Sequence, residues 1–449
     1  MKKLLCMMLL ALACVAQAAN TDEYENAKAV IARRDYAAAL KTLRDLAAKG
    51  NAAGQYKLGW MVDHGLGVPK DPVEAVKWYR LAADQNYGNA QATLGWMYEN
   101  GSGVQQNFAE AAKWYRLAAQ QGDAIGRFDL GVLYRDGNGV AKDEAEALKW
   151  FRLAAAQKLD LAQDELGDAY HYGRGVPQDY AQAMKWYRLA ARQDNGAAQA
   201  SLGKMYDFGD GVSPNIAEAL KWYRLAADQG VADAQVNLGS MYYKGKGVAQ
   251  DFKQALALFK LAADQGDETA QYNLGVAYYD GQGVAQNFPE ALKIFRAGAA
   301  RGKANAQLYL GIMSRRGLGV PQDDAQAVKW FQLAAAQGQP IAQTRLGWMV
   351  EQGKGIAKDE VQAVKWFRLA AEQGDTNGQS NLGVKYLNGE GIAQDYVHAY
   401  MWLHLAALSG EDGAAEKSSN AAKHMTAEQI TLATNMARAC QLKKFKACD

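Results

Sequence analysis

The clearest candidates for chemistry are acidic and imidazole side chains in one short segment. Asp164, Asp168 and His171 follow one another at steps of four and three residues, and this spacing places them on one face of a helix. Asp207 stands 36 residues after His171. Such oxygen and nitrogen ligands could bind a divalent cation, but they equally suit a polar stretch of solvated groove. We favour the polar surface and expect no resident metal ion or cofactor, although the sequence leaves the cation alternative open.

A second candidate is the Gly-x-Gly pattern that begins at Gly65 and ends with the copy at Gly389. Glycine-rich loops can cradle phosphates, but a dinucleotide or P-loop fingerprint also needs a preceding strand and further glycines or a lysine. The chain supplies neither, and its five histidines form no metalloprotease motif. We therefore interpret each Gly-x-Gly as a structural turn and expect no enzymatic activity.

The element that carries these residues is a strict repeat. A Leu-Gly dipeptide recurs every 36 residues, from Leu58 to Leu382, in ten copies between Ala52 and Glu411. A fixed period of this length is typical of solenoids, in which each unit buries its apolar face against its neighbours.

One copy, Ala90 to Gly122, shows how a unit folds. Its first helix contains Gly95, whose missing side chain we expect to let the partner helix approach closely. After the Gly-x-Gly turn, Asn107 and Glu110 predict a capping box that opens a second helix. Apolar residues at helical spacing follow, with Trp114 as the expected buried anchor. The unit is therefore a helical hairpin.

These motifs resemble the Sel1-like repeat, a relative of the tetratricopeptide repeat with an added Gly-x-Gly loop. The resemblance covers Ala52 to Glu411 in ten copies. It implies an all-α fold, an α/α solenoid superhelix, in which an N-terminal helical hairpin at residues 20–51 and a C-terminal helix within residues 412–449 cap the ten repeats at 52–411.

The flanking segments predict export. Residues 1–19 have a basic start, an apolar run and an Ala-Gln-Ala cleavage site, as in a secretory signal. The alternative is a lipoprotein signal, with Cys14 as the lipidated first residue of the mature chain. Export would leave Cys440 and Cys448 as the mature cysteines, and we expect a disulfide that pins the tail. The expected location is the periplasm or the exterior.

Charge limits the partners. Without Lys2 and Lys3, the 50 basic residues become equal in number to the 48 acidic ones. This balance argues against nucleic acid as a partner, and no stretch approaches the ~20 apolar residues of a membrane span. We expect a monomer that binds a protein or peptide.

In tetratricopeptide relatives, the first helices line a concave groove and bind partners through three positions. These lie two residues before, two after and five after the Leu of the Leu-Gly dipeptide. In this chain they vary from copy to copy, which is typical of a surface available for recognition. The resulting candidates for partner binding are Tyr56, Trp60, Trp96, Glu99, Phe128, Arg135, Tyr243, Tyr272, Tyr279, Ile312, Arg315 and Trp348.

The resemblance therefore implies a non-enzymatic scaffold or adaptor, with envelope regulation, polymer export or host interaction as settings. The alternative is a β-lactam-binding or β-lactam-hydrolysing protein, because cysteine-rich Sel1-like proteins have been described in this way. This chain lacks the cysteine pairs that such proteins carry in each repeat.

Overall fold

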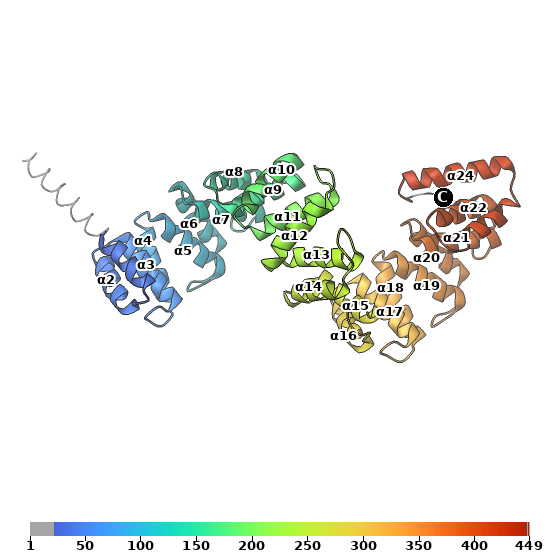
Figure 1. Cartoon of the computed structure of the whole chain (residues 1–449), viewed down its shortest axis with the longest axis horizontal. Helices are drawn as coiled ribbons and strands as arrows, with labels where there is room; N and C mark the ends of the chain where they lie inside the picture. Colours follow the sequence, from blue (N-terminus) through green and yellow to red (C-terminus); the bar gives the residue numbers. More distant parts are fainter. Residues whose placement is uncertain (1–21, 447, 449) are drawn as a thin grey trace, which may run out of the picture. The chain divides into compact units, whose positions relative to one another are not determined.

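Paired α-helices make up the fold. The computed structural model describes residues 22–446 and 448, and all regular structure in this part of the chain is helical. The predicted signal sequence and the alternative at Cys14 lie outside the described residues. The chain divides between Val231 and Ala232 into two compact units, each a run of stacked hairpins. Consecutive helices are labelled along the chain in Figure 1.

Each repeat contains a first and a second helix. The first helices are α3 (Ala52–His64), α5 (Gly88–Asn100), α7 (Ala124–Asp136), α9 (Asp160–Tyr172), α11 (Gly196–Phe208), α13 (Ala232–Lys244), α15 (Glu268–Asp280), α17 (Ala304–Arg316), α19 (Pro340–Gln352) and α21 (Thr376–Asn388). The second helices are α4 (Pro72–Ala83), α6 (Phe108–Gln120), α8 (Glu144–Ala155), α10 (Tyr180–Ala191), α12 (Ile216–Asp228), α14 (Phe252–Asp264), α16 (Phe288–Ala300), α18 (Asp324–Ala336), α20 (Glu360–Ala371) and α22 (Tyr396–Leu408).

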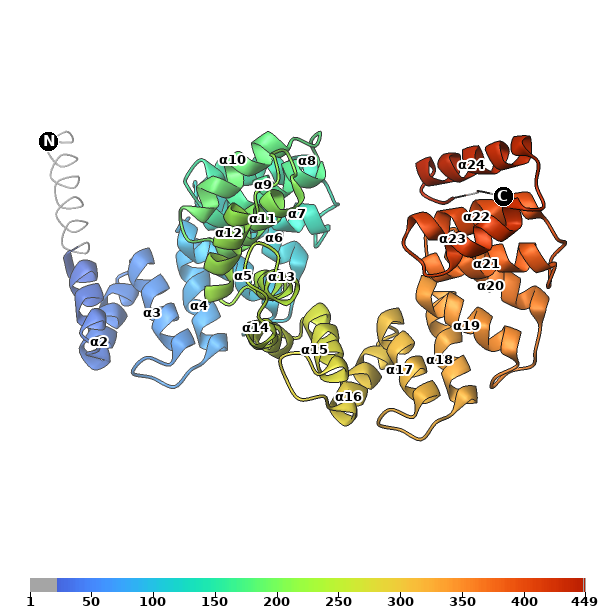
Figure 2. The same cartoon turned by 45° about the vertical axis from the view of Figure 1, so that its right-hand side comes forward.

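Further helices flank the repeats. Residues 22–32 are helical and pair with α2 (Tyr36–Ala48), whose buried Leu40, Leu43 and Leu46 join the core of the first repeat. At the other end, α23 (Ala414–Ala422) and α24 (Ala427–Leu442) lie beside α22 (Figure 2). Thr426 and Gln429 form a capping box at the start of α24.

The glycine of the Leu-Gly dipeptide marks a close approach between the two helices of a repeat. A Cβ atom added at Gly95 would lie 2.6 Å from the ring of Tyr115. The same clash recurs in other repeats, for example between Gly131 and the ring of Phe151. The close approach that we expected at this glycine is therefore present. The ring that packs against it belongs to the residue after Trp114, the expected anchor.

The expected anchor position is wrong by one residue. Tyr115 is fully buried, whereas Trp114 is only partly buried and packs against the core of the preceding repeat. Neighbouring residues on a helix point about 100° apart, so both cannot face the partner helix. Trp402 is an exception, because α23 and α24 cover it completely.

The turn between the helices needs both of its glycines. Gly101 ends α5 in the left-handed region at φ 68°, where glycine is favoured. Gly103 has φ 69°, and a Cβ atom there would lie 2.3 Å from the carbonyl oxygen of Pro72 in the preceding repeat. The Gly-x-Gly segment is thus a turn that also packs against its neighbour.

The capping box at Asn107 is only half formed. The Asn107 side chain accepts a hydrogen bond from the Glu110 N–H at 3.1 Å, as predicted. The Asn107 N–H instead donates to the carbonyl of Tyr98 at 2.8 Å, and the Glu110 carboxylate pairs with Lys113. The Tyr98 carbonyl in the last turn of α5 therefore accepts from the donor that Glu110 was expected to satisfy.

The two described cysteines form a disulfide-capable pair. Their Cα atoms lie 5.1 Å apart, within the usual range for a disulfide. Cys440 is buried against the core that includes Trp402. The pair can thus hold the tail after α24 against the last repeat.

Candidate partner-binding groove

Some neighbouring first helices lie close together. Among the described residues, the pairs α5 and α7, α9 and α11, and α19 and α21 approach each other more closely than any two second helices. This difference agrees with the expectation that the first helices line the concave side of each unit. The predicted binding positions lie on these helices.

Two of the three predicted positions face the groove. Trp96, two residues after its Leu, has 48% of its surface exposed, while Trp60, Ile312 and Trp348 at the same position are half-buried. The residues five after the Leu are also half-buried; they are Glu99, Arg135, Tyr243, Tyr279 and Arg315. Their side chains remain accessible, and whether a partner uses them stays a prediction.

The third position is largely occupied by internal packing. Tyr56 lies 5.6 Å from the ring of Tyr79 between centroids, and Phe128 lies 5.7 Å from Phe151. Tyr272 likewise contacts Phe295, at 6.3 Å. These side chains cover the buried anchor rings, so they offer a partner only part of their surface.

A further groove position was missed by sequence reasoning. The residue directly before the Leu lies beside the preceding first helix, and it varies as much as the predicted positions do. Its copies include Asp129, Glu165, Tyr309 and Arg345, all of which are partly buried. Their variation at fixed spacing was the signal that could have revealed them.

This position pairs with a predicted one across the repeat boundary. Arg135, five after its Leu, forms an ion pair with Glu165, directly before the next Leu. Tyr279 and Tyr309, at the same two positions, lie 5.2 Å apart between ring centroids. Both pairs are 30 residues apart in sequence. The same two repeat positions therefore meet across the repeat boundary in both units.

The acidic cluster of repeat four does not converge on one point. Asp168 accepts hydrogen bonds from Tyr187 and Arg174, each at 2.7 Å. His171 Nε2 lies 3.6 Å from a carboxylate oxygen of Asp210. Asp207 belongs to no metal-like group among the described residues. The geometry thus favours the polar groove that we expected over a cation site.

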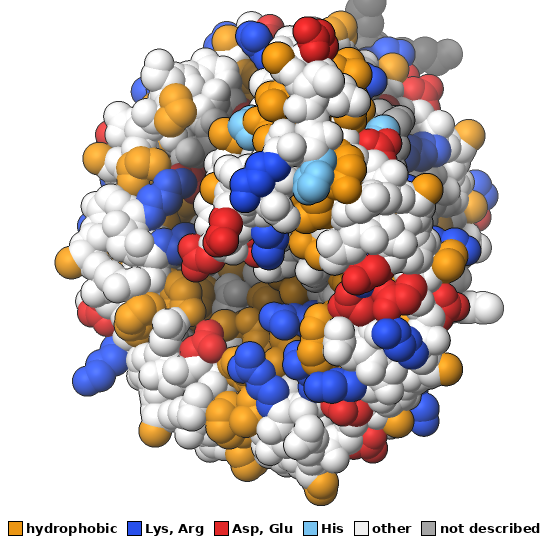
Figure 3. Space-filling view, turned by 90° about the vertical axis from the view of Figure 1, so that its right-hand side faces the viewer, with side chains coloured by type: hydrophobic (Ala, Val, Ile, Leu, Met, Phe, Trp, Pro, Cys, Tyr) orange, Lys and Arg blue, Asp and Glu red, His pale blue; other side chains and the backbone are white. Residues whose placement is uncertain are grey.

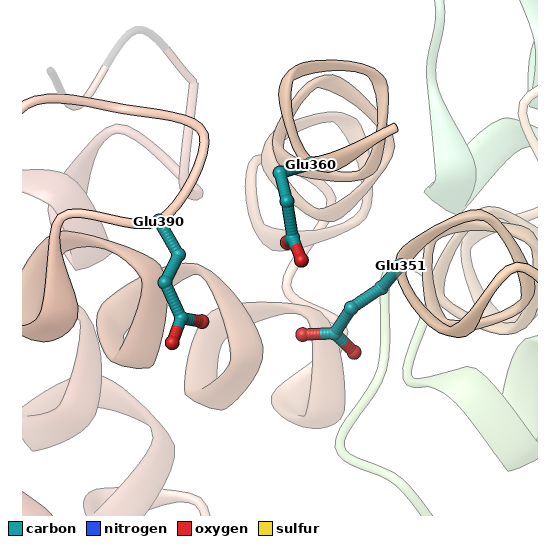
Figure 4. A group of neighbouring side chains, drawn as sticks. All are labelled: Glu351, Glu360 and Glu390. Atoms are coloured by element: carbon teal, nitrogen blue, oxygen red, sulfur yellow. The ribbon is translucent and has the colours of Figure 1, made fainter. Parts of the chain in front are cut away.

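A different cluster does converge, and it already holds a cation. Glu351, Glu360 and Glu390 direct their carboxylates toward one another (Figure 4), with oxygens within 4.8 Å. The Lys385 ammonium lies among them, in ion pairs with Glu351, with Glu360 at 2.9 Å and with Glu390 at 2.8 Å. Burial alone would lower the pKa of Lys385, but the three hydrogen bonds outweigh it and raise that pKa. The cluster is an internal ion network.

Asp129 makes the groove of unit 1 sensitive to pH. Burial, followed by the charges of Glu99 and Asp123, raises its pKa to about 7. A carboxyl group with a raised pKa stabilises the fold fully below its unfolded pKa, near 3.9, and this stability is lost as pH rises through about 7.

The free energy of unfolding of Asp129→Asn minus that of the wild type is therefore expected to rise by at least about 1 kcal/mol from pH 5 to pH 8. Chemical unfolding of both proteins at the two pH values measures this difference. Asp136→Asn is the control, because Arg135 lowers the pKa of Asp136 and the variant should show no such gain. An equal pH dependence of wild type and Asp129→Asn would contradict the assignment.

Comparison with known families decides what this architecture is. The Sel1 repeat family matches ten consecutive segments, at residues 52–87, 88–123, 124–159, 160–195, 196–231, 232–267, 269–303, 304–339, 340–375 and 376–411. The chain belongs to the Sel1 repeat family. Sel1 repeat proteins are protein-interaction scaffolds, and their fold is typically non-catalytic.

Two solved structures support this assignment. A protective antigen of uropathogenic Escherichia coli that displays a Sel1-like fold is 37% identical, with a TM-score of 0.59 and coverage of 90% of this chain and 95% of that one. A Sel1 repeat protein from Oxalobacter formigenes is 32% identical, with a TM-score of 0.52 and coverage of 68% and 89%. No curated protein matches the chain.

One spacing relevant to the β-lactam alternative does occur in the repeats. Ser201 and Lys204 have the Ser-x-x-Lys spacing of serine β-lactamases. Both residues lie inside α11 and not at its start, so no free helix N-terminal N–H groups surround Ser201 to stabilise an oxyanion. The spacing therefore gives no support for hydrolysis.

No helix in the described chain combines the length and hydrophobicity needed to cross a bilayer.

Proposed function

We propose that the chain is a non-enzymatic scaffold of the periplasm or the exterior that binds a protein or peptide partner in the grooves of its first helices. The observation that carries the proposal is the set of accessible aromatic and charged side chains on one face, with Trp96 about half exposed. Aromatic and arginine side chains supply most of the binding energy at protein interfaces.

Export is supported by three observations. Residues 1–19 have the pattern of a secretory signal, and the disulfide-capable pair suits an oxidising compartment. The relative from uropathogenic E. coli is a protective antigen, which agrees with a location outside the cytoplasm. Envelope regulation, polymer export and host interaction remain the proposed settings.

Two zones of the groove are proposed as separate contact regions. Trp60 and Trp96 belong to the first zone, in unit 1, and Tyr279 and Trp348 belong to the second, in unit 2. The polar cluster around Asp168 follows the first zone along the chain. A long or bipartite partner would suit this arrangement.

Capture of partners from an envelope extract, followed by titration calorimetry with the captured partner, tests the proposal. We expect Trp96→Ala to weaken binding by at least about 2 kcal/mol without changing the melting temperature, because Trp96 is exposed on the groove. Lys113→Ala, on the outer face of α6, is the matched control and should leave affinity unchanged. If Lys113→Ala abolishes binding while Trp96→Ala has no effect, the partner uses the convex face.

A further inference from the structure

We propose that a basic pocket in repeats seven to nine binds a carboxylate of an acidic peptide. This inference rests on the proposed scaffold function and names the chemistry of one part of the partner. The pocket has a volume of about 130 Å³, and its lining residues are Tyr279, Tyr309, Ile312, Arg315, Arg316, Phe331 and Arg345. Three first helices, α15, α17 and α19, supply most of this lining.

Comparison within the chain shows that the pocket lacks a negative charge. Arg315 and Arg345 occupy the same two repeat positions as Arg135 and Glu165. In unit 1 this pair is an arginine and a glutamate, which form an ion pair. In unit 2 both members are arginines. A second guanidinium therefore stands at the repeat position where unit 1 has a carboxylate.

Two of the three arginines contact aromatic side chains. The Arg315 guanidinium lies 4.2 Å from the ring centroid of Trp348, and Arg316 Nη1 lies 3.5 Å from the Tyr279 hydroxyl. None of the three arginines forms an ion pair within 4.0 Å among the residues that the structure describes. No ion pair among the described residues therefore offsets their mutual repulsion.

The surroundings of Arg345 disfavour its positive charge. Burial, together with Arg315 and Arg316, lowers its pKa. The acid that most favours its charge is Asp375, but one oxygen of Asp375 already accepts the Gly378 N–H and the Thr344 hydroxyl, each at 2.7 Å. An external anion would relieve this repulsion.

The pocket suits a carboxylate on an apolar stem. Guanidinium groups bind carboxylates through two parallel hydrogen bonds, and the partly exposed rings of Tyr279 and Tyr309 offer apolar surface for the methylene groups. Basic side chains lie beside hydrophobic ones around a hollow on the face shown in Figure 3. A nucleic acid would instead need a long basic track, which the balanced charge of the chain does not provide.

Fluorescence anisotropy with a labelled Glu-Ala octapeptide and its Gln-Ala counterpart tests the pocket. We expect the wild type to bind the Glu peptide at least tenfold more tightly than the Gln peptide. Arg345→Glu should abolish this preference without lowering the melting temperature, since the new carboxylate can pair with Arg315 as Glu165 pairs with Arg135. A loss of preference accompanied by a lower melting temperature would reflect misfolding and overturn the expected pairing.

Two further variants make the test specific. Lys329→Glu makes the same change from a positive to a negative charge on the exposed face of α18. This variant should keep the preference for the Glu peptide. Glu165→Arg places two arginines in the equivalent register of unit 1 and should add affinity for the Glu peptide. Equal binding of both peptides by the wild type would overturn the inference. An equal loss of the preference for the Glu peptide in Lys329→Glu would also overturn it. So would displacement of the labelled Glu peptide by inorganic phosphate but not by acetylglutamate.

The inference and the proposed function fail in different ways. If a captured partner binds Arg345→Glu as tightly as the wild type but loses affinity for Trp96→Ala, the scaffold function stands and the basic pocket is unused. If neither groove variant affects that partner, the groove function itself is wrong.

Discussion

Tyr115→Ala is expected to lower the free energy of unfolding by about 3–5 kcal/mol, measured by urea unfolding at neutral pH. The Tyr115 ring is fully buried and fills the space left by Gly95 on the partner helix. Alanine would leave a cavity between the two helices of repeat two, which the backbone contact at Gly95 cannot close. Because a solenoid is stabilised by contacts between neighbours, the loss should also weaken the adjoining repeats.

The matched control is Trp114→Ala. Trp114 is partly buried against the preceding repeat, so its removal should cost only about 1–2 kcal/mol. Tyr115→Phe should be much milder than Tyr115→Ala, because Phe151 fills the equivalent position in repeat three. It would lose only the hydrogen bond that the Tyr115 hydroxyl donates to Glu99 at 2.6 Å. A larger loss in Trp114→Ala than in Tyr115→Ala would restore the tryptophan as the anchor.

Lys385→Met should destabilise unit 2 by about 2–3 kcal/mol. Removal of one partner of a fully buried ion pair costs about 3–5 kcal/mol, and the cost is expected to be smaller here because the glutamates keep some contact with water. Methionine fits the space, since Met97, Met205 and Met349 occupy the same repeat position. The cost arises because Glu351, Glu360 and Glu390 would then repel one another without a central cation.

The pH dependence separates this charge effect from packing. The Lys385 hydrogen bond lowers the pKa of Glu360. A carboxylate with a lowered pKa stabilises the fold above its unfolded pKa, near 4.3, and that stability is lost as pH falls through the folded pKa. The advantage of wild type over Lys385→Met should thus be full at pH 7 and shrink below about pH 4.

Lys358→Met is the control for this network. Lys358 also pairs with Glu360, at 3.0 Å, but its side chain is 62% exposed. Exposed ion pairs contribute about 0–1 kcal/mol, so this variant should remain close to the wild type in thermal unfolding. A penalty for Lys385→Met that persists unchanged at pH 3 would mean that shape, and not charge, is responsible.

The sequence alone determined the repeat architecture. A Leu-Gly dipeptide every 36 residues, a Gly-x-Gly turn and a capping residue such as Asn107 are local signals, and each acts within one hairpin. The same signals repeated ten times predict the same hairpin ten times. The positions two and five after the Leu could also be predicted as groove positions, because a helix orients residues by spacing alone.

Tertiary structure decided which neighbouring side chain is buried and which charges meet. Trp114 and Tyr115 are neighbouring large aromatic residues of one helix, and only the close approach at Gly95 selects Tyr115 for the core. Likewise, Arg135 meets Glu165 while Arg315 faces Arg345, because adjacent first helices bring positions 30 residues apart into contact. Such contacts depend on how one repeat is rotated against the next. A period in the sequence gives the length of a repeat but does not contain this rotation.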